Sequence, residues 1–229
     1  MIVSHKHKFI FLAVAKTGTT SIEKVLNGYV EEPFFTDDMA DNRGHERFDK
    51  GGWITRKSRT HPLRKHTSAQ ELKAYLEEQG WDWDSYFKFG FVRNPWSKIL
   101  SQYYFILEQS RREVSEGAGN WEKLWIKDCQ ENMAKHPDFN TYASSYKWEM
   151  TPLLVVDGRF IDFIGRFENL QVDFNYVCDR IGIPRQTLPV KNKTKHGNYH
   201  DYYNDESREA VRRNFETDIK NFGYEFYDA

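Results

Sequence analysis

Cysteine is scarce in this chain: Cys129 and Cys178 are the two among 229 residues. A chain of this length buries a sizeable core without cross-links, so two cysteines exclude the disulfide-rich class and predict ordinary thiols in a reducing compartment. Long apolar runs are also lacking. The longest early one, residues 9–15, falls well short of the roughly 20 residues that a membrane-spanning helix needs. We therefore expect a soluble, cytoplasmic protein without a membrane span.

A surplus of either charge is missing as well. The 33 lysines and arginines nearly balance the 34 aspartates and glutamates, which leaves a formal net charge of −1. Proteins that bind nucleic acids or membrane surfaces typically have a basic surplus, so the overall charge favours neither class. Aromatic residues are plentiful, at 16% of the chain. Many of them lie in segments with apolar periodicity, where core packing is the default interpretation.

The apolar pattern predicts strands that alternate with helices in one α/β domain spanning residues 1–229. Residues 9–14 are continuously apolar and residues 87–92 give a second apolar segment, as in strands that helices cover on both faces. A hairpin is expected over residues 152–165, because an Asp-Gly pair separates two apolar runs there. Helices are expected at residues 22–26 (ended by Gly28), 68–80 (opened by a capping box at Ser68–Glu71), from Asn94-Pro95 onward, and at 121–134, 170–181 and 205–222.

Residues 29–66 show no clear period. Within them, residues 56–66 include five lysines and arginines and no acid. A long segment without regular structure in a compact domain is usually functional, so we expect this variable insertion to bind the acceptor substrate. A solvated surface excursion is the alternative.

The loop from Lys16 to Ser21 joins the first predicted strand to a helix. The N–H groups and the positive dipole end at the start of a helix attract anions. Gly18 lets the backbone approach an anion closely, the hydroxyls of Thr17, Thr19, Thr20 and Ser21 can add donors, and Lys16 adds a full positive charge. The loop is not a Walker A motif, because its lysine comes first and the second glycine is missing. It predicts a phosphate or sulfate site without the usual magnesium arrangement, although the same residues also cap ordinary helices.

Arg93 follows the second predicted strand, and Ser101 lies near the second turn of the helix after it. Ligands of parallel α/β sheets collect beyond the carboxyl ends of the strands. A guanidinium there can bind a phosphate with two hydrogen bonds. Two anion sites at one sheet edge suggest a nucleotide with phosphates at both ends. The alternative is that Arg93 pairs with a carboxylate and holds the strand end.

These segments resemble the sulfotransferases. Residues 16–21 (KTGTTS) are similar to the loop that binds the 5′-phosphosulfate in that family, and residues 91–95 (FVRNP) with Ser101 are similar to its 3′-phosphate site. The C-terminal half resembles the carbohydrate (type 2) branch in residues 162–170, 188–196, 202–203 and 222–224. One departure is Ala15, where many relatives have proline before the loop lysine.

The resemblance implies a P-loop-like, three-layer α/β/α fold around a central, mostly parallel sheet. It implies 3′-phosphoadenosine 5′-phosphosulfate (PAPS) as the sulfuryl donor, no metal, and a segment that closes over the nucleotide, for which Thr194 and Lys195 are the matching positions. The partners would be this nucleotide and a hydroxyl acceptor, a glycan or a small molecule. A charged surface loop is the alternative for Thr194 and Lys195.

Transfer to a hydroxyl also needs a base for the acceptor proton. Relatives have a similar Lys-His stretch before the Phe-Val-Arg strand, and a histidine in that region is the base in some of them, so His66 is our candidate. His61 and the carboxylates of the variable segment are the alternatives. Two other functions stay open: a small-molecule kinase of the P-loop class, and a nucleotide-binding module of the same fold without catalysis.

Overall fold

The computed structural model describes residues 1–30, 65–114, 120–189 and 196–227. The chain divides into two compact units, described separately here. The first contains residues 1–92 and 152–192, and the second contains residues 93–151 and 193–229. The expectation of one domain over residues 1–229 stays a prediction.

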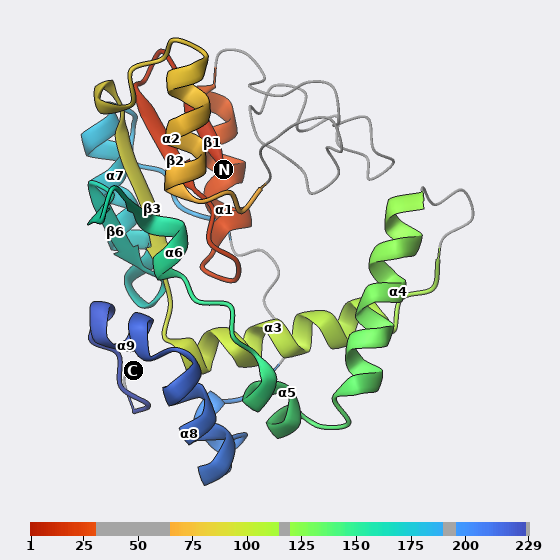
Figure 1. Ribbon diagram of the computed structural model, residues 1–229. Coiled ribbons are helices and arrows are strands. Elements are labelled where there is room, and N and C mark those ends of the chain that lie inside the picture. The colour runs from red at the N-terminus through yellow and green to blue at the C-terminus, as the bar shows by residue number, and fades with distance from the viewer. Residues whose placement is uncertain (31–64, 115–119, 190–195, 228–229) are drawn as a thin grey trace. The chain divides into compact units, whose positions relative to one another are not determined.

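The first unit is built on a four-stranded sheet in the order β1-β2-β3-β6 (Figure 1). Strands β2, β3 and β6 are parallel, and β1 pairs antiparallel with β2 at one edge. Its strands are β1 (Ile2–Ser4), β2 (Phe9–Leu12), β3 (Phe87–Val92) and β6 (Phe163–Arg166). The carboxyl ends of β2, β3 and β6 therefore meet at the same edge of the sheet.

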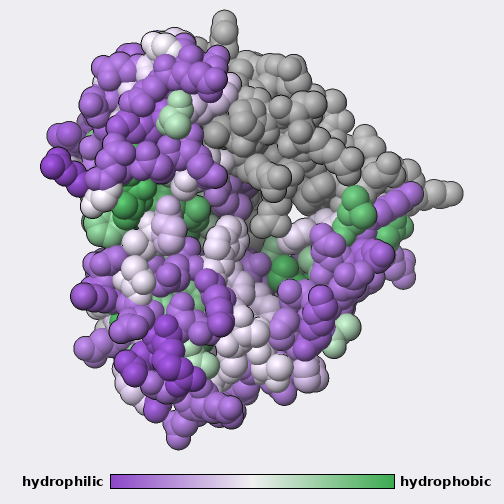
Figure 2. Space-filling model, viewed as in Figure 1, coloured by the Kyte–Doolittle hydropathy of each residue, from purple (hydrophilic) through white to green (hydrophobic). Residues whose placement is uncertain are grey.

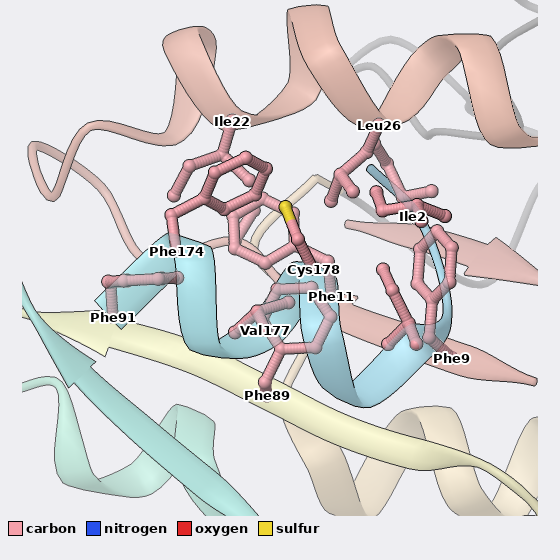
Figure 3. Packing of buried hydrophobic residues seen from close by; sticks show 13 residues of the cluster. Ile2, Phe9, Phe11, Ile22, Leu26, Phe89, Phe91, Phe174, Val177 and Cys178 are labelled. Atoms are coloured by element: carbon pink, nitrogen blue, oxygen red, sulfur yellow. The ribbon is translucent and has the colours of Figure 1, made fainter. Parts of the chain in front are cut away.

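Helices cover both faces of this sheet. Alternate residues of β2 and β3, among them Phe11 and Phe89, pack with Ile22 of α1 (Thr19–Leu26) and Phe174 of α7 (Leu170–Ile181) (Figure 3). Ile10 points to the opposite face and is fully buried too. Since a strand alternates its side chains, burial of both sets requires cover on both sides. The fold is α/β with a central, mostly parallel sheet flanked by helices, as predicted.

Several local predictions are confirmed in the first unit. Helix α2 (Ala69–Glu78) begins with the capping box, in which the Ser68 hydroxyl accepts from the Glu71 N–H. The charged outer residues of α2 contribute to the hydrophilic surface in Figure 2. The turn at Asp157-Gly158 joins β4 (Val155–Val156) to β5 (Arg159–Phe160), and both turn residues have positive φ, 50° and 75°, as a tight hairpin requires.

Other local predictions were wrong. Strand β1 was not predicted, because a three-residue edge strand is too short to show a period. Gly28 does not end α1 in a left-handed conformation, because the chain continues into a 3-10 turn over Asn27–Tyr29. The predicted hairpin over 152–165 was too long: a helical turn, α6 (Thr151–Leu154), precedes β4, and β6 joins the main sheet instead.

The second unit is helical among its described residues. Helix α3 begins where predicted, with the Asn94 side chain accepting from the N–H groups of Trp96 and Ser97 and with Pro95 in the first turn. The predicted helix over 205–222 is two helices, because Phe215 leaves the helical conformation, with φ −122° and ψ 27°, and is fully buried. The helices are α3 (Pro95–Ser110), α4 (Asn120–Lys135), α5 (Phe139–Ser145), α8 (Asp205–Asn214) and α9 (Glu216–Phe222).

Among the residues that the structure describes, none of the helices combines the length and the apolar character that crossing a bilayer requires.

Lys98 is a buried cation in the second unit. Its ammonium donates to the Trp148 carbonyl at 2.8 Å and lies over the rings of Tyr146 and Phe215. Burial lowers the pKa of Lys98 from 10.5 to about 8, while the nearby Asp218 carboxylate acts in the opposite direction. Between these pH values the unfolded chain binds more protons at this position than the folded chain, so the Lys98 contribution makes the folded state more stable as the pH rises.

We expect this contribution to be visible against Lys98→Met, which keeps the length of the side chain and removes the titration. Between pH 8 and 9.5 the free energy of unfolding of the wild type should rise by about 1.5 kcal/mol relative to that of the variant. Urea unfolding at the two pH values measures both proteins. Parallel pH dependence in wild type and variant would contradict the assignment.

Candidate active site

The loop after β2 has an unusual backbone. Lys16 has a φ of 67° and Gly18 a φ of 80°, both in the left-handed region. Glycine adopts this conformation freely, whereas a lysine there costs about 1–2 kcal/mol. Strained backbone of this kind concentrates at functional sites. The loop therefore turns sharply between the end of β2 and the start of α1.

Two hydroxyls of the loop stabilise this turn. Thr17 donates its hydroxyl proton to the Val14 carbonyl at 2.9 Å, and Thr19 donates to the same carbonyl at 2.6 Å. Both residues are buried. What these two threonines offer to a ligand is thus their backbone N–H groups, while their side chains hold the loop against the strand end.

Helix α1 begins directly after Gly18, whose carbonyl accepts from the N–H groups of Ser21 and Ile22. Thr19 and Thr20 occupy the first two helical positions, where no carbonyl of the same helix can accept from the N–H group. The positive end of the helix dipole lies at the same place. The loop therefore combines a helix N-terminus with a lysine, and such a combination can bind a phosphate or a sulfate.

Gly18 is also required by packing. A Cβ atom at this position would lie 2.6 Å from the Leu170 Cδ2 atom and 3.5 Å from the Phe167 ring. Both neighbours belong to the C-terminal segment that resembles the sulfotransferases. The contact gives that segment a physical role: it packs beneath the loop and fixes its shape.

Gly18→Ala should therefore disturb the loop, while Gly28→Ala is a matched control, since a Cβ at Gly28 meets nothing within 4 Å. We expect Gly18→Ala to destabilise the fold by about 1–2 kcal/mol and to abolish measurable nucleotide binding. Thermal unfolding and calorimetric titration with 3′-phosphoadenosine 5′-phosphate (PAP) test both effects. Equal binding by the two variants would contradict the role of the loop.

His66 lies at the carboxyl end of β2. Its Nδ1 atom is 2.6 Å from the carbonyl oxygen of Ala13, the residue immediately after the strand. A carbonyl only accepts, so Nδ1 bears the proton and Nε2 has the lone pair of the neutral ring. The structure thus places His66 against Ala13, which is three residues before Lys16 in the sequence. The tautomer is the one that a base acting through Nε2 needs.

The residue before His66 is anchored to α1. The Lys65 ammonium binds the Glu23 carboxylate at 2.8 Å, and the Glu23 side chain is 3% exposed. An ion pair shielded from water in this way is held more firmly than one on the surface. It ties the chain next to His66 to the helix that begins at the loop. The partnership of Glu23 with Lys65 was not predicted, because the sequence pattern of a helix does not show which residue a glutamate pairs with.

Arg93 and Ser101 lie in the second unit, at and after the start of α3. Arg93 is 8% exposed and Ser101 is 4% exposed. The Arg93 guanidinium donates to the Ser97 hydroxyl, from Nε at 3.1 Å and from Nη2 at 2.8 Å. Ser97 and Ser101 are four residues apart and thus share one face of the helix. Ser97 was not among the site residues predicted from the sequence.

Some predicted residues lie outside the described residues: Thr194, Lys195, His61 and most of the variable segment. Two tryptophans that precede β3, Trp81 and Trp83, are within the described residues. Trp83 is buried in the core, and Trp81 stacks on the His5 ring at 3.8 Å, at the end of the sheet opposite to the loop. Within the described ranges, no group of three or more His, Cys, Asp or Glu side chains is arranged to hold a metal ion.

Comparison with known proteins gives three matches. The model of the sulfotransferase family matches residues 1–225. An uncharacterised protein of Archaeoglobus fulgidus is 28% identical over 116 residues, which are 51% of this chain and 84% of that protein. A crystal structure of a sulfotransferase from Alicyclobacillus acidocaldarius aligns with 93% of this chain and 92% of its own, at 15% identity and a TM-score of 0.42. The family match includes the loop after β2 and the start of α3.

Proposed function

The chain belongs to the sulfotransferase family, and from this premise we propose that it transfers a sulfuryl group from PAPS to a hydroxyl of a carbohydrate or another small acceptor. The loop Lys16–Ser21 would bind the 5′-phosphosulfate end of the donor. Arg93 and Ser101 would bind its 3′-phosphate. His66 would accept the proton of the acceptor hydroxyl.

The observation that most supports this proposal is the position of His66 at the strand end from which the loop starts. The Ala13 carbonyl binds His66, and the next carbonyl, that of Val14, binds Thr17 and Thr19. The proposed base and the proposed anion loop are thereby hydrogen-bonded to consecutive residues just after β2. Group transfer from an anion to a hydroxyl needs these two elements close together.

The register of the sheet supports the second phosphate site. Leu12 of β2 pairs with Gly90 of β3, so Arg93 follows three residues after the partner of the last β2 residue. The backbones that lead to the loop and to Arg93 thus leave adjacent parallel strands at the same edge. Ligands of such sheets bind at that edge, which supports the assignment of Arg93 to a phosphate.

The proposed reaction is an in-line displacement at sulfur. The acceptor oxygen forms a bond to sulfur while the bond between sulfur and the 5′-phosphate oxygen breaks, and PAP leaves with that electron pair. The acceptor proton passes to Nε2 of His66. Lys16 and the N–H groups of the loop stabilise the negative charge that grows on the leaving phosphate.

Labelled donors test the proposal directly. Incubation with sulfur-labelled PAPS and a panel of glycans and small hydroxyl compounds should give a labelled product, and Lys16→Met should not. A parallel series with γ-labelled ATP and magnesium examines the kinase alternative. Transfer from ATP alone would overturn the proposal, and tight PAP binding without transfer to any acceptor would favour a binding module.

A further inference from the structure

One contact at the proposed 3′-phosphate site concerns a residue that the proposed function does not use. The Ser97 hydroxyl accepts two hydrogen bonds from one edge of the Arg93 guanidinium, from Nε at 3.1 Å and Nη2 at 2.8 Å. We propose that Ser97 is a positioning residue for Arg93. This inference rests on the proposed function, since it assigns Arg93 to the donor 3′-phosphate.

The two hydrogen bonds to Ser97 fix the orientation of the Arg93 guanidinium. A guanidinium is planar and has five N–H donors in a fixed arrangement, so two bonds along one edge define the orientation of the whole group. The long arginine side chain otherwise has considerable rotamer freedom, which binding would have to remove. Ser97 removes part of that freedom before the nucleotide arrives, and a site ordered in advance binds more tightly.

The acceptor that orients Arg93 is a neutral hydroxyl. A carboxylate could also hold Arg93, but it would neutralise the guanidinium and compete with a phosphate for it. Ser97 is uncharged, so this contact does not itself neutralise the guanidinium. A neutral acceptor is therefore suited to orient an arginine that must still bind an anion.

Ser97 itself is held in the first turn of α3. Asn94 accepts the backbone N–H of Ser97 at 3.4 Å, which fixes the first turn of α3. Ser97 and Ser101 are four residues apart in α3 and share one face of the helix, while Arg93, which precedes the helix, reaches Ser97 through its guanidinium. Ser97 thus connects the two residues proposed to bind the 3′-phosphate, and its effect should be limited to ligands that have this phosphate.

The experiment compares PAP with adenosine 5′-phosphate, which lacks the 3′-phosphate. Calorimetric titration of Ser97→Ala should show about tenfold weaker binding of PAP and unchanged binding of adenosine 5′-phosphate. Ser97→Thr keeps the hydroxyl and should restore most of the PAP affinity. Ser110→Ala is the matched control, because Ser110 ends the same helix and its hydroxyl binds the Leu107 carbonyl. Thermal unfolding of each variant accompanies the titrations.

Arg93→Ala distinguishes a failure of the proposed 3′-phosphate site from a failure of the proposed role of Ser97. We expect about 100-fold weaker PAP binding by this variant, because a charged bidentate partner is lost. If Arg93→Ala binds PAP as the wild type does, the proposed 3′-phosphate site is wrong. If Arg93→Ala weakens PAP binding but Ser97→Ala does not, the role of Ser97 alone is wrong. A loss of both ligands in Ser97→Ala, together with a lower unfolding temperature, would also overturn it, because the residue would then be merely structural.

Discussion

His66→Ala is expected to lower kcat for sulfuryl transfer by about 10²- to 10⁴-fold, the usual contribution of a general base. The reason is that the Ala13 carbonyl holds Nδ1 at 2.6 Å and thereby assigns the lone pair to Nε2. Donor binding should change little, because the anion loop does not depend on the imidazole. The measurement is PAP release from PAPS with the acceptor that the panel identifies, combined with PAP titration.

His7→Ala is the control for this variant. His7 lies just before β2, at the opposite end of the strand from Ala13, and contacts Tyr29 edge to face. Its removal should leave kcat unchanged. Added imidazole should partly restore transfer by His66→Ala, since a small base can enter the vacated space. If His66→Ala keeps the wild-type kcat, His66 is not the base, and His61 or a carboxylate of the variable segment becomes the candidate.

Lys16→Met is expected to lower kcat by about 10²- to 10³-fold. This is the usual loss when one group that stabilises charge in a transition state is removed. The lysine is held in a left-handed conformation, with φ 67°, at the start of the loop. Its charge is needed most when the 5′-phosphate leaves, so kcat should fall more than the affinity for PAP. Steady-state rates and PAP titration of the same preparation separate the two.

Lys24→Met is the matched control for charge. Lys24 lies on α1, in its last turn, and is exposed. Both substitutions remove one positive charge from the same strand–loop–helix segment. Equal rates for Lys16→Met and Lys24→Met would contradict the assignment of Lys16 to the leaving group.

The parts of this protein that sequence predicts well are those whose signals are local. The strand Phe87–Val92 and the capping box at Ser68 follow from short patterns with one physical meaning. The assignment of the loop Lys16–Ser21 to an anion stays a prediction, because the same residue types also occur at ordinary helix starts. The strained φ at Lys16 is visible only in the structure.

The remaining features depend on partners far away in the sequence. His66 was chosen by resemblance, and its bond to Ala13 joins residues 53 positions apart. The ion pair between Glu23 and Lys65 spans 42 positions and has no local signature. The expected helix over 205–222 was wrong for a related reason: the apolar period continues through Phe215, but burial of that ring interrupts the backbone. Ser97 could have been noted from the sequence, since it lies four residues before Ser101 in the same predicted helix.

The proposed function assigns the 3′-phosphate of the donor to Arg93, which lies just before α3. The most direct measurement compares PAP with its isomer that has the second phosphate at the 2′ position. The two nucleotides have equal charge, so general electrostatic attraction cannot distinguish them. We predict that wild-type protein binds PAP at least about tenfold more tightly, through the oriented hydrogen bonds of Arg93. Equal affinity for the two isomers would contradict a 3′-phosphate site and the account built on it.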